Sequence, residues 1–493
     1  MHRLIHIIIL SLCLTTSSFS LNSYLTERLS TGKYNQSQLQ LALAIGNTSA
    51  KYIAFSERTP GSLPWLNLAK SLGRQDPEIA WQLALYYQQK SYSRETFYWQ
   101  NHAFQLGAES AIIERAKQLS TTNEQYQQAK ELLQAIDNEE SYILQTRLAV
   151  KFSDFIHLQS LLPKLTSFNE TKLLNELLAY QVLPSFSSEK APFVKTVSAS
   201  CRNNIQFFAS NLTDLNRLDA LIDKVKSNDF FNQQFCFNTP KYIALETLQC
   251  SHRHGDRINC DVELLIQQGL SNDVKYIGLM APEGVANVNN GVLYIDQLDT
   301  HSVLEHELLH LIGFIDEYPL HKLNSACEQQ GALAKNVVNF KRSIYSSDQA
   351  ARAKVLPLLP WKDLIKPTTP ISYKTAEGYR LGTPNEFSND VGLFNSNTCK
   401  NYLAAGGDNQ SFKPINKVSQ LQYFEEPLPI VYQQLARLAG EQFNMPSYHY
   451  NIGKKYNQKD DVVQANYWFE KADRVEAAVK MNTLPFTKPK RVN

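Results

Sequence analysis

Three residues of the sequence have the types and the spacing of a zinc site that performs hydrolysis. His306, Glu307 and His310 form the pattern His-Glu-x-x-His. If this stretch is helical, the two histidines lie on one face with Cβ atoms about 5–6 Å apart. Both imidazoles can then reach one Zn²⁺ at about 2.0–2.1 Å. Glu307 lies beside the metal, where its carboxylate can take a proton from a metal-bound water. The motif therefore predicts a metal-assisted hydrolase.

A third protein ligand is expected just beyond the motif. Gly313 stands where a helix can end in a left-handed residue, and the resulting turn would bring Asp316 back to the metal. Two histidines and one carboxylate leave the fourth tetrahedral position open for water or substrate, as a catalytic zinc requires. Glu317 is the rival third ligand. Tyr318 is a candidate for the substrate cleft, with core packing as its alternative. The alternative for the whole motif is a buried amphipathic helix that carries two histidines.

One helix is expected to position these residues. Ser302 followed by Glu305 predicts a capping box at its N-terminus. Apolar residues recur at helical spacing and are expected to face a core: Leu304, Leu308, Leu311 and Ile315.

A mixed α/β region is expected around this helix. Strands are predicted at 276–280 and, from a weaker pattern, at 206–209. The segments 285–288 and 292–295 flank Asn289-Asn290-Gly291, which predicts a β-hairpin. The zinc helix is expected shortly after the second strand of this hairpin.

Length and charge limit the classes of protein. At 493 residues the chain is too long for one ordinary domain, so two to four are expected. The net charge is +2 and charged residues make up 19% of the chain. This composition lacks the electrostatic footprint of a nucleic-acid-binding protein.

The N-terminus and the cysteines predict an exported protein. Residues 1–20 combine a basic start, a short apolar run and small polar residues, which is typical of a secretory signal peptide. The apolar run is too short to span a membrane, and no membrane span is expected after cleavage. Beyond Cys13, an even number of cysteines favours disulfides in a periplasmic or secreted protein, with Cys250–Cys260 as the local pair. The six cysteines are Cys201, Cys236, Cys250, Cys260, Cys327 and Cys399.

Both ends of the mature chain have helical patterns. Residues 21–185 predict successive helices with short polar connectors, among them 38–45, 63–72, 78–89, 96–106, 110–119, 123–136 and 142–152. An internal comparison at one constant offset matches Pro77, Leu83, Tyr87, Trp99, Ala103, Leu106 and Ala108 with Pro446, Ile452, Tyr456, Trp468, Ala472, Val475 and Ala477.

These two stretches resemble Sel1-like repeats, which are relatives of the tetratricopeptide repeat. The resemblance covers roughly 35 residues in each copy and implies a scaffold that binds a protein partner. A plain helical bundle is the alternative for the N-terminal part.

The central region resembles the metzincin group of zinc peptidases. The extended pattern from His306 to Asp316 is similar to that of snapalysin-like enzymes, and its continuation into Tyr318 is similar to that of the IgA-peptidase-like metalloproteases. The resemblance implies that His306, His310 and Asp316 bind zinc and that Glu307 is the general base. It also implies that the strand just before the helix is a sheet edge on which a substrate peptide pairs.

One feature departs from the metzincin pattern. Metzincins carry a methionine turn beneath the metal, and the four methionines here are Met1, Met280, Met445 and Met481. The segments 397–403 and 418–424 occupy the expected place, with the layout of a turn and then a helix. On this resemblance Leu403 replaces the methionine, and Tyr402 is a candidate transition-state helper.

The sequence therefore predicts a multidomain fold, in which α-helical Sel1/TPR-like repeats flank a central α/β metzincin-like zinc-peptidase domain. The expected parts are the signal peptide 1–20, helical repeats 21–185, the peptidase-like domain 198–424 and a C-terminal repeat 430–485. The predicted function is hydrolysis of peptide bonds in a protein or peptide substrate. The alternative functions are a repeat scaffold with a structural or vestigial metal site, and zinc-dependent hydrolysis of a non-peptide bond.

Overall fold

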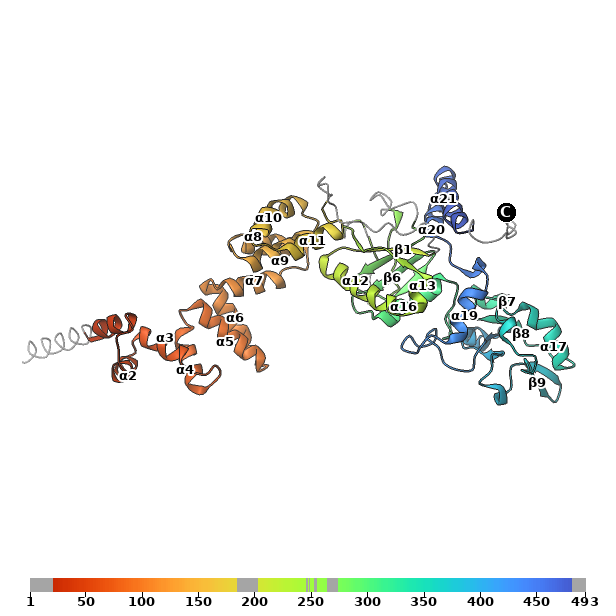
Figure 1. Ribbon diagram of the computed structural model, residues 1–493, viewed down its shortest axis with the longest axis horizontal. Helices are drawn as coiled ribbons and strands as arrows, with labels where there is room; N and C mark the ends of the chain where they lie inside the picture. The colour runs from red at the N-terminus through yellow and green to blue at the C-terminus, as the bar shows by residue number, and fades with distance from the viewer. Residues whose placement is uncertain are drawn as a thin grey trace, which may run out of the picture. The chain divides into compact units, whose positions relative to one another are not determined.

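The computed structural model describes residues 21–183, 203–244, 247, 249–251, 255–263 and 274–480. Within this part, the chain forms two compact units. The first comprises residues up to 152 together with 156–169, and the second comprises 153–155 and residues from 170 onward. The first unit is helical and the second combines helices with sheets, which confirms a mixed, multidomain architecture (Figure 1). The predicted signal peptide lies outside the described residues, as do the last residues of the two predicted helical parts, 184–185 and 481–485.

The first unit is a succession of short helices, as expected from the sequence. Polar residues in the connectors start several of them, because the side chains of Asn35, Asp76 and Asn138 each accept a hydrogen bond from a first-turn N–H group. Residues 21–30 are also helical. The helices that follow are α2 (Gln36–Ala44), α3 (Thr48–Ser56), α4 (Leu63–Leu72), α5 (Pro77–Gln89), α6 (Ser93–Leu106), α7 (Glu109–Gln118), α8 (Asn123–Gln134), α9 (Glu139–Lys151) and α10 (Phe155–Ser167).

The two stretches related by the internal sequence match both form helical hairpins. The first hairpin is α5 with α6, and the second is α20 (Tyr448–Gln458) with α21 (Val462–Lys480). Matched positions are buried in both: Leu83, Trp99 and Ala103 in the first, and Ile452, Trp468 and Ala472 in the second.

The second unit is built on a six-stranded, mostly parallel sheet. Its strand order is β2-β1-β4-β6-β5, and β3 also pairs with β1. Its central strands are nearly continuous apolar runs, as expected for strands covered on both faces. The strands are β1 (Asn204–Ala209), β2 (Cys236–Phe237), β3 (Lys241–Tyr242), β4 (Tyr276–Ala281), β5 (Asn287–Asn289) and β6 (Val292–Asp296). Both predicted strands and the predicted hairpin are present.

The predicted sheet edge is wrong. β6, the strand just before the zinc-motif helix, is an interior strand that pairs with β4 on one side and with β5 on the other. The edge strand is β5. The reason is the tight turn at Asn290 and Gly291, whose φ angles of 45° and 79° suit a two-residue hairpin turn. This turn places β5 directly beside β6.

Helices cover both faces of this sheet. Ile277 and Leu279 of β4 share a core with Trp468 of the C-terminal hairpin. Alternate residues of a strand face opposite sides, and on the other side the Tyr276 hydroxyl donates hydrogen bonds to the carbonyls of Leu311 and Met445 at 3.0 Å each. That side carries α12 (Leu212–Lys226) and α16 (His301–Leu311), which contact each other. α11 (Thr171–Ala179) and α13 (Asp229–Gln234) complete this part.

Residues after α16 form smaller sheets and short helices. An antiparallel sheet has the strand order β11-β12-β8-β7, and β9 pairs with β10. The strands are β7 (Gly331–Ala332), β8 (Val338–Lys341), β9 (Ser372–Thr375), β10 (Gly378–Leu381), β11 (Phe394–Asn395) and β12 (Asn409–Lys413). The helices are α17 (Asp348–Val355), α18 (Lys400–Ala404) and α19 (Ile430–Leu438), with 3-10 turns at Ser325–Glu328, Leu356–Leu358, Lys362–Leu364, Asn385–Phe387 and Glu441–Phe443.

Two disulfides are described in the second unit. Cys250–Cys260 confirms the predicted local pair, and Cys327–Cys399 joins segments that are 72 residues apart. Cys236 is also disulfide-bonded, and Cys201 lies outside the described residues. Disulfides are typical of an oxidising compartment, outside the cell or in the periplasm. Among the described helices, none combines the length and the apolar character needed to cross a bilayer.

Candidate metal centre

The zinc-motif helix α16 begins two residues earlier than the predicted capping box would place it. Its N-cap is Thr300, without a side-chain capping bond, so Ser302 lies inside the first turn and the predicted capping box is wrong. Glu305 instead accepts hydrogen bonds from the side chains of Gln420 and Asn228, at 3.0 and 3.4 Å. The helix ends as predicted, because Gly313 has a φ of 91°.

Gly313 is required by its surroundings as well as by its backbone angle. A Cβ atom at this position would lie 2.7 Å from the carbonyl group of Phe443. The left-handed backbone of Gly313 turns the chain back along the helix. As a result, the segment from Phe314 to Tyr318 runs past the histidines.

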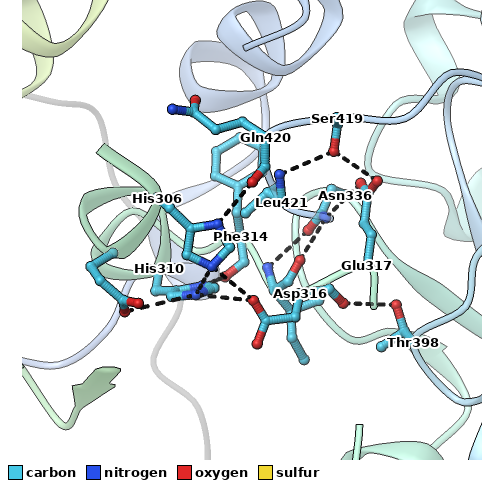
Figure 2. A network of polar contacts seen from close by, with 12 residues as sticks. His306, His310, Phe314, Asp316, Glu317, Asn336, Thr398, Ser419, Gln420 and Leu421 are labelled. Atoms are coloured by element: carbon cyan, nitrogen blue, oxygen red, sulfur yellow. Dashed lines mark hydrogen bonds and ion pairs between the residues drawn. The ribbon is translucent and has the colours of Figure 1, made fainter. Parts of the chain in front are cut away.

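Asp316 and the two histidines converge on one point (Figure 2). The His306 and His310 Nε2 atoms lie 3.2 Å apart. The Asp316 Oδ1 atom lies 3.1 Å from the first and 3.2 Å from the second. The three atoms therefore form a nearly equilateral triangle. Their side chains retain between 8% and 13% of their exposure, so the triangle is not sealed from solvent.

The opposite nitrogen of each imidazole is held by a backbone carbonyl. His306 Nδ1 lies 2.8 Å from the Gln420 oxygen, and His310 Nδ1 lies 3.1 Å from the Phe314 oxygen. Because a carbonyl only accepts, each Nδ1 carries a hydrogen, and in a neutral imidazole Nε2 is then a bare acceptor. Two acceptor nitrogens and a carboxylate oxygen at these distances form a donor set that could hold a cation. Outer partners of this kind are typical of metal-binding histidines.

The charges of the site favour a cation as well. Burial lowers the pKa of His310, but the Asp316 carboxylate outweighs burial and raises that pKa to about 9. Burial raises the pKa of Asp316, but His310 and His306 outweigh it and hold that pKa well below its usual range. The site therefore attracts positive charge.

Glu307 lies beside this triangle and is buried. Together with His306 and His310 it forms the one group, among the described residues, of three or more side chains that could hold a metal ion. Its Oε2 atom lies 4.0 Å from His310 Nε2 and has no hydrogen-bond partner among the described residues. Burial raises the pKa of Glu307, against the opposing effect of the imidazoles. Asp316 is thus nearer to the imidazoles, and Glu307 has an oxygen free to take a proton.

Glu317, the rival ligand, is engaged elsewhere. Its side chain is completely buried and accepts hydrogen bonds from Asn336, Lys413, Ser419 and Tyr432. Tyr318 is 37% exposed next to the site. Burial raises the pKa of Tyr318, and the interaction of its hydroxyl with Asp316 raises that pKa further.

Tyr402 is not among the residues that the structure brings to the triangle. It packs in a cluster with the Cys327–Cys399 disulfide and Leu320. The segment 418–424, expected to be helical, contains turns instead. The Gln420 carbonyl of this segment contacts the imidazole of His306, and Thr398 of the segment 397–403 donates a hydrogen bond to the Asp316 carbonyl (Figure 2).

A positively charged side chain, Arg257, lies near the site on the loop closed by the Cys250–Cys260 disulfide. Arg257 is exposed and its backbone pairs with Val285, just before the edge strand β5. Its positive charge acts to lower the pKa of both Glu307 and Tyr318. Neither Arg257 nor Gln420 was singled out from the sequence, because neither belongs to a local pattern.

Comparison of the chain with protein-family models, with curated proteins and with solved structures finds no match. The interpretation of the site therefore depends on its own residues: a buried His-Glu-His group that could hold a metal ion, with Asp316 against both imidazoles.

Proposed function

We propose that this chain is an exported, zinc-dependent endopeptidase. One observation carries the proposal: the triangle formed by the His306 and His310 Nε2 atoms and Asp316 Oδ1, with sides of 3.1–3.2 Å, next to the unpartnered Oε2 of Glu307. A binding site and a proton acceptor are thus placed side by side, as metal-assisted hydrolysis requires.

The donor set suits zinc. Zinc is commonly bound by imidazole nitrogens and carboxylate oxygens at about 2.0–2.2 Å in a tetrahedral arrangement. Ligand atoms around such a tetrahedron are about 3.3–3.4 Å apart, close to the 3.1–3.2 Å of the triangle. Three protein ligands leave one position for water or substrate. His306, His310 and Asp316 would therefore hold the ion, and Glu317 would not.

Bound zinc would supply Lewis acidity for the scissile carbonyl and would lower the pKa of a water molecule. The protein residues supply the rest. Glu307 accepts the proton of the attacking water at Oε2 as the new C–O bond forms. The same carboxyl group then donates that proton to the leaving amine as the C–N bond breaks. Burial raises the pKa of Glu307, which favours the first of these transfers, from water to the carboxylate.

The disulfides and the helical first unit support the other parts of the proposal. The Cys250–Cys260 and Cys327–Cys399 disulfides fit export to an oxidising compartment. The helical first unit suits a role in binding a protein substrate or partner, because its α6 helix exposes Phe97 and Tyr98. The repeat family and the metzincin family are inferred from sequence resemblance.

Glu307→Gln tests this function. The purified wild-type protein is expected to contain one zinc per chain by elemental analysis and to cleave a panel of denatured proteins. Glu307→Gln should retain the zinc and lose the cleavage, because the amide cannot accept the proton. Activity that survives this change would refute the peptidase. Full biological function in a folded, zinc-loaded Glu307→Gln variant would favour the scaffold.

A further inference from the structure

Glu317 is at the centre of a buried polar network next to the candidate metal centre (Figure 2). Its Oε1 atom accepts hydrogen bonds from Asn336 Nδ2 at 3.1 Å and from the Tyr432 hydroxyl. Its Oε2 atom accepts from Lys413 Nζ and from Ser419 Oγ, each at 2.8 Å. A carboxylate has about four lone-pair sites, and all four are used. Glu317 has no acceptor capacity left for a metal ion.

The four donors come from segments that are far apart in the sequence. Asn336 precedes β8, Lys413 ends β12, Ser419 is in the turn that follows, and Tyr432 is in α19. Glu317 therefore joins four parts of the second unit to the segment that carries Asp316.

Two of these donors, Ser419 and Asn336, lie next to the groups that contact the imidazoles. Ser419 precedes Gln420, whose carbonyl accepts the Nδ1–H bond of His306. The Glu317 amide donates to the Leu421 carbonyl at 2.9 Å, which fixes the same turn from its other side.

Asn336 fixes the segment on the other side of Asp316. Its side chain accepts a bond from the Ile315 amide at 3.0 Å and donates to the Ile315 carbonyl at 2.8 Å. Asp316 is thus flanked by Ile315 and Glu317, both of which are bonded to Asn336.

We infer that Glu317 is a positioning residue: it holds the Asp316 segment and the Gln420 carbonyl in the arrangement that the cation needs, and so sets the metal affinity without touching the metal. The inference depends on the metal site proposed above. It separates two neighbouring carboxylates by function, since one faces the imidazoles and the other faces the network.

A double variant tests this role. Glu317→Gln alone would leave the buried Lys413 without its counter-charge, which is strongly destabilising. Glu317→Gln with Lys413→Met removes both charges. Ser419→Ala is the second, milder variant, because it deletes only one donor.

The measurement is the affinity for Zn²⁺, by competition with a chelator, and the absorption spectrum with Co²⁺ as the probe. Folding is checked by near-ultraviolet circular dichroism. We expect the double variant to bind one ion about 10–100-fold more weakly, as for other outer-shell changes. Ser419→Ala should weaken binding in the same direction. In both, the Co²⁺ bands should persist, because the three ligands remain.

Trp361→Phe is the matched control. It removes a buried hydrogen bond of 2.8 Å to the Gly392 carbonyl in the same unit and leaves the metal centre untouched. It should lower the melting temperature and leave the Zn²⁺ affinity unchanged. Wild-type affinity in the double variant and in Ser419→Ala would overturn the inference, as would loss of the Co²⁺ bands in a folded double variant, which would make Glu317 a ligand. A wild-type protein that binds no Zn²⁺ would instead refute the proposed function.

Discussion

Asp316 and Glu317 are neighbours in the chain but have opposite surroundings. Asp316 lies against two imidazoles, whereas Glu317 accepts hydrogen bonds from a lysine, a serine, an asparagine and a tyrosine. The spacing after the histidines predicted the position of Asp316, because a helix and one turn fix it locally. The partners of Glu317 could not be predicted, because they come from residues 336, 413, 419 and 432 and no local periodicity links them.

Under the proposed peptidase function, Arg257 is expected to assist hydrolysis through its charge. The transition state carries developing negative charge, which a nearby cation stabilises. Because the side chain is exposed, Arg257→Ala should lower kcat/KM about 2–5-fold at low salt, equivalent to ~1 kcal/mol or less. The loss should shrink as ionic strength rises. Steady-state kinetics at several salt concentrations measure it, with Arg257→Lys as the control that keeps the charge. An equal loss in both variants would contradict a purely electrostatic role.

At the scale of elements, the local patterns predicted the helices of the first unit, the strands β1 and β4, and the β5–β6 hairpin. The capping box predicted at Ser302 is absent because a tight turn follows β6. In this turn the Asp296 carboxylate accepts hydrogen bonds from the amides of Leu298 and Asp299, at 2.7 and 3.0 Å. This turn starts α16 directly after Thr300. The segment 418–424 is not helical, because its carbonyls accept hydrogen bonds from elsewhere. The Gln420 carbonyl accepts from the His306 imidazole, and the Leu421 carbonyl accepts from the Glu317 amide.

Gly313 is expected to be the most sensitive backbone position near the site. Gly313→Ala introduces both a left-handed alanine and a contact with Phe443. Gly406 is the matched control, with a φ of 97° and nothing within 4 Å of an added Cβ. Gly406→Ala should cost only the conformational strain, about 1–2 kcal/mol. Gly313→Ala should cost at least about 1–3 kcal/mol more, from overpacking, and should weaken Zn²⁺ binding. Urea unfolding of both variants measures the difference. Equal losses in the free energy of unfolding would show that Phe443 moves aside without an energetic penalty.

The Cys327–Cys399 disulfide stabilises the segments around the site. It packs with Ile315 and Leu320, and the neighbouring Thr398 donates a hydrogen bond of 2.8 Å to the Asp316 carbonyl. Closing a loop across a separation of 72 residues should stabilise the fold by about 4 kcal/mol through the entropy of the unfolded chain. Replacing both cysteines with alanine should therefore lower the free energy of unfolding by about this amount and lower the Zn²⁺ affinity. Chemical denaturation and chelator competition test the two effects. An unchanged affinity would show that the disulfide acts on stability alone.

At the scale of the whole molecule, the C-terminal hairpin is part of the second unit's core, because Tyr448, Ile452 and Trp468 pack with β4 and β6. Within it, His449 is 1% exposed and neither ring nitrogen has a hydrogen-bond partner among the described residues. Its ring stacks on Trp468 at 5.8 Å. The sequence predicted that this hairpin is helical, but only the structure shows that it covers the sheet face that carries Ile277 and Leu279.

His449 should make the second unit sensitive to acid. Burial, helped by Lys471, lowers the pKa of His449 from 6.5 to about 4. The neutral ring is therefore preferred in the folded state. Stability is fully present above pH 6.5 and is lost as pH falls towards 4, by on the order of 3 kcal/mol.

His449→Phe should lose less stability than the wild type over this pH range, because phenylalanine does not titrate. Urea unfolding at pH 7 and at pH 4 measures the difference between the two proteins. Parallel losses in both proteins would show that other groups cause the acid sensitivity.

The Tyr276 hydroxyl bonds to the carbonyls of Leu311 and Met445, and the sequence separation between Tyr276 and Met445 is 169 residues. The Met445 amide also bonds to the Leu311 carbonyl at 3.0 Å. During synthesis, the ribosome makes the histidine-bearing helix long before it makes the segment that fastens the end of that helix. The candidate metal centre therefore gains this support only late in translation, so a partly made chain would carry His306, His310 and Asp316 before the end of the helix is held.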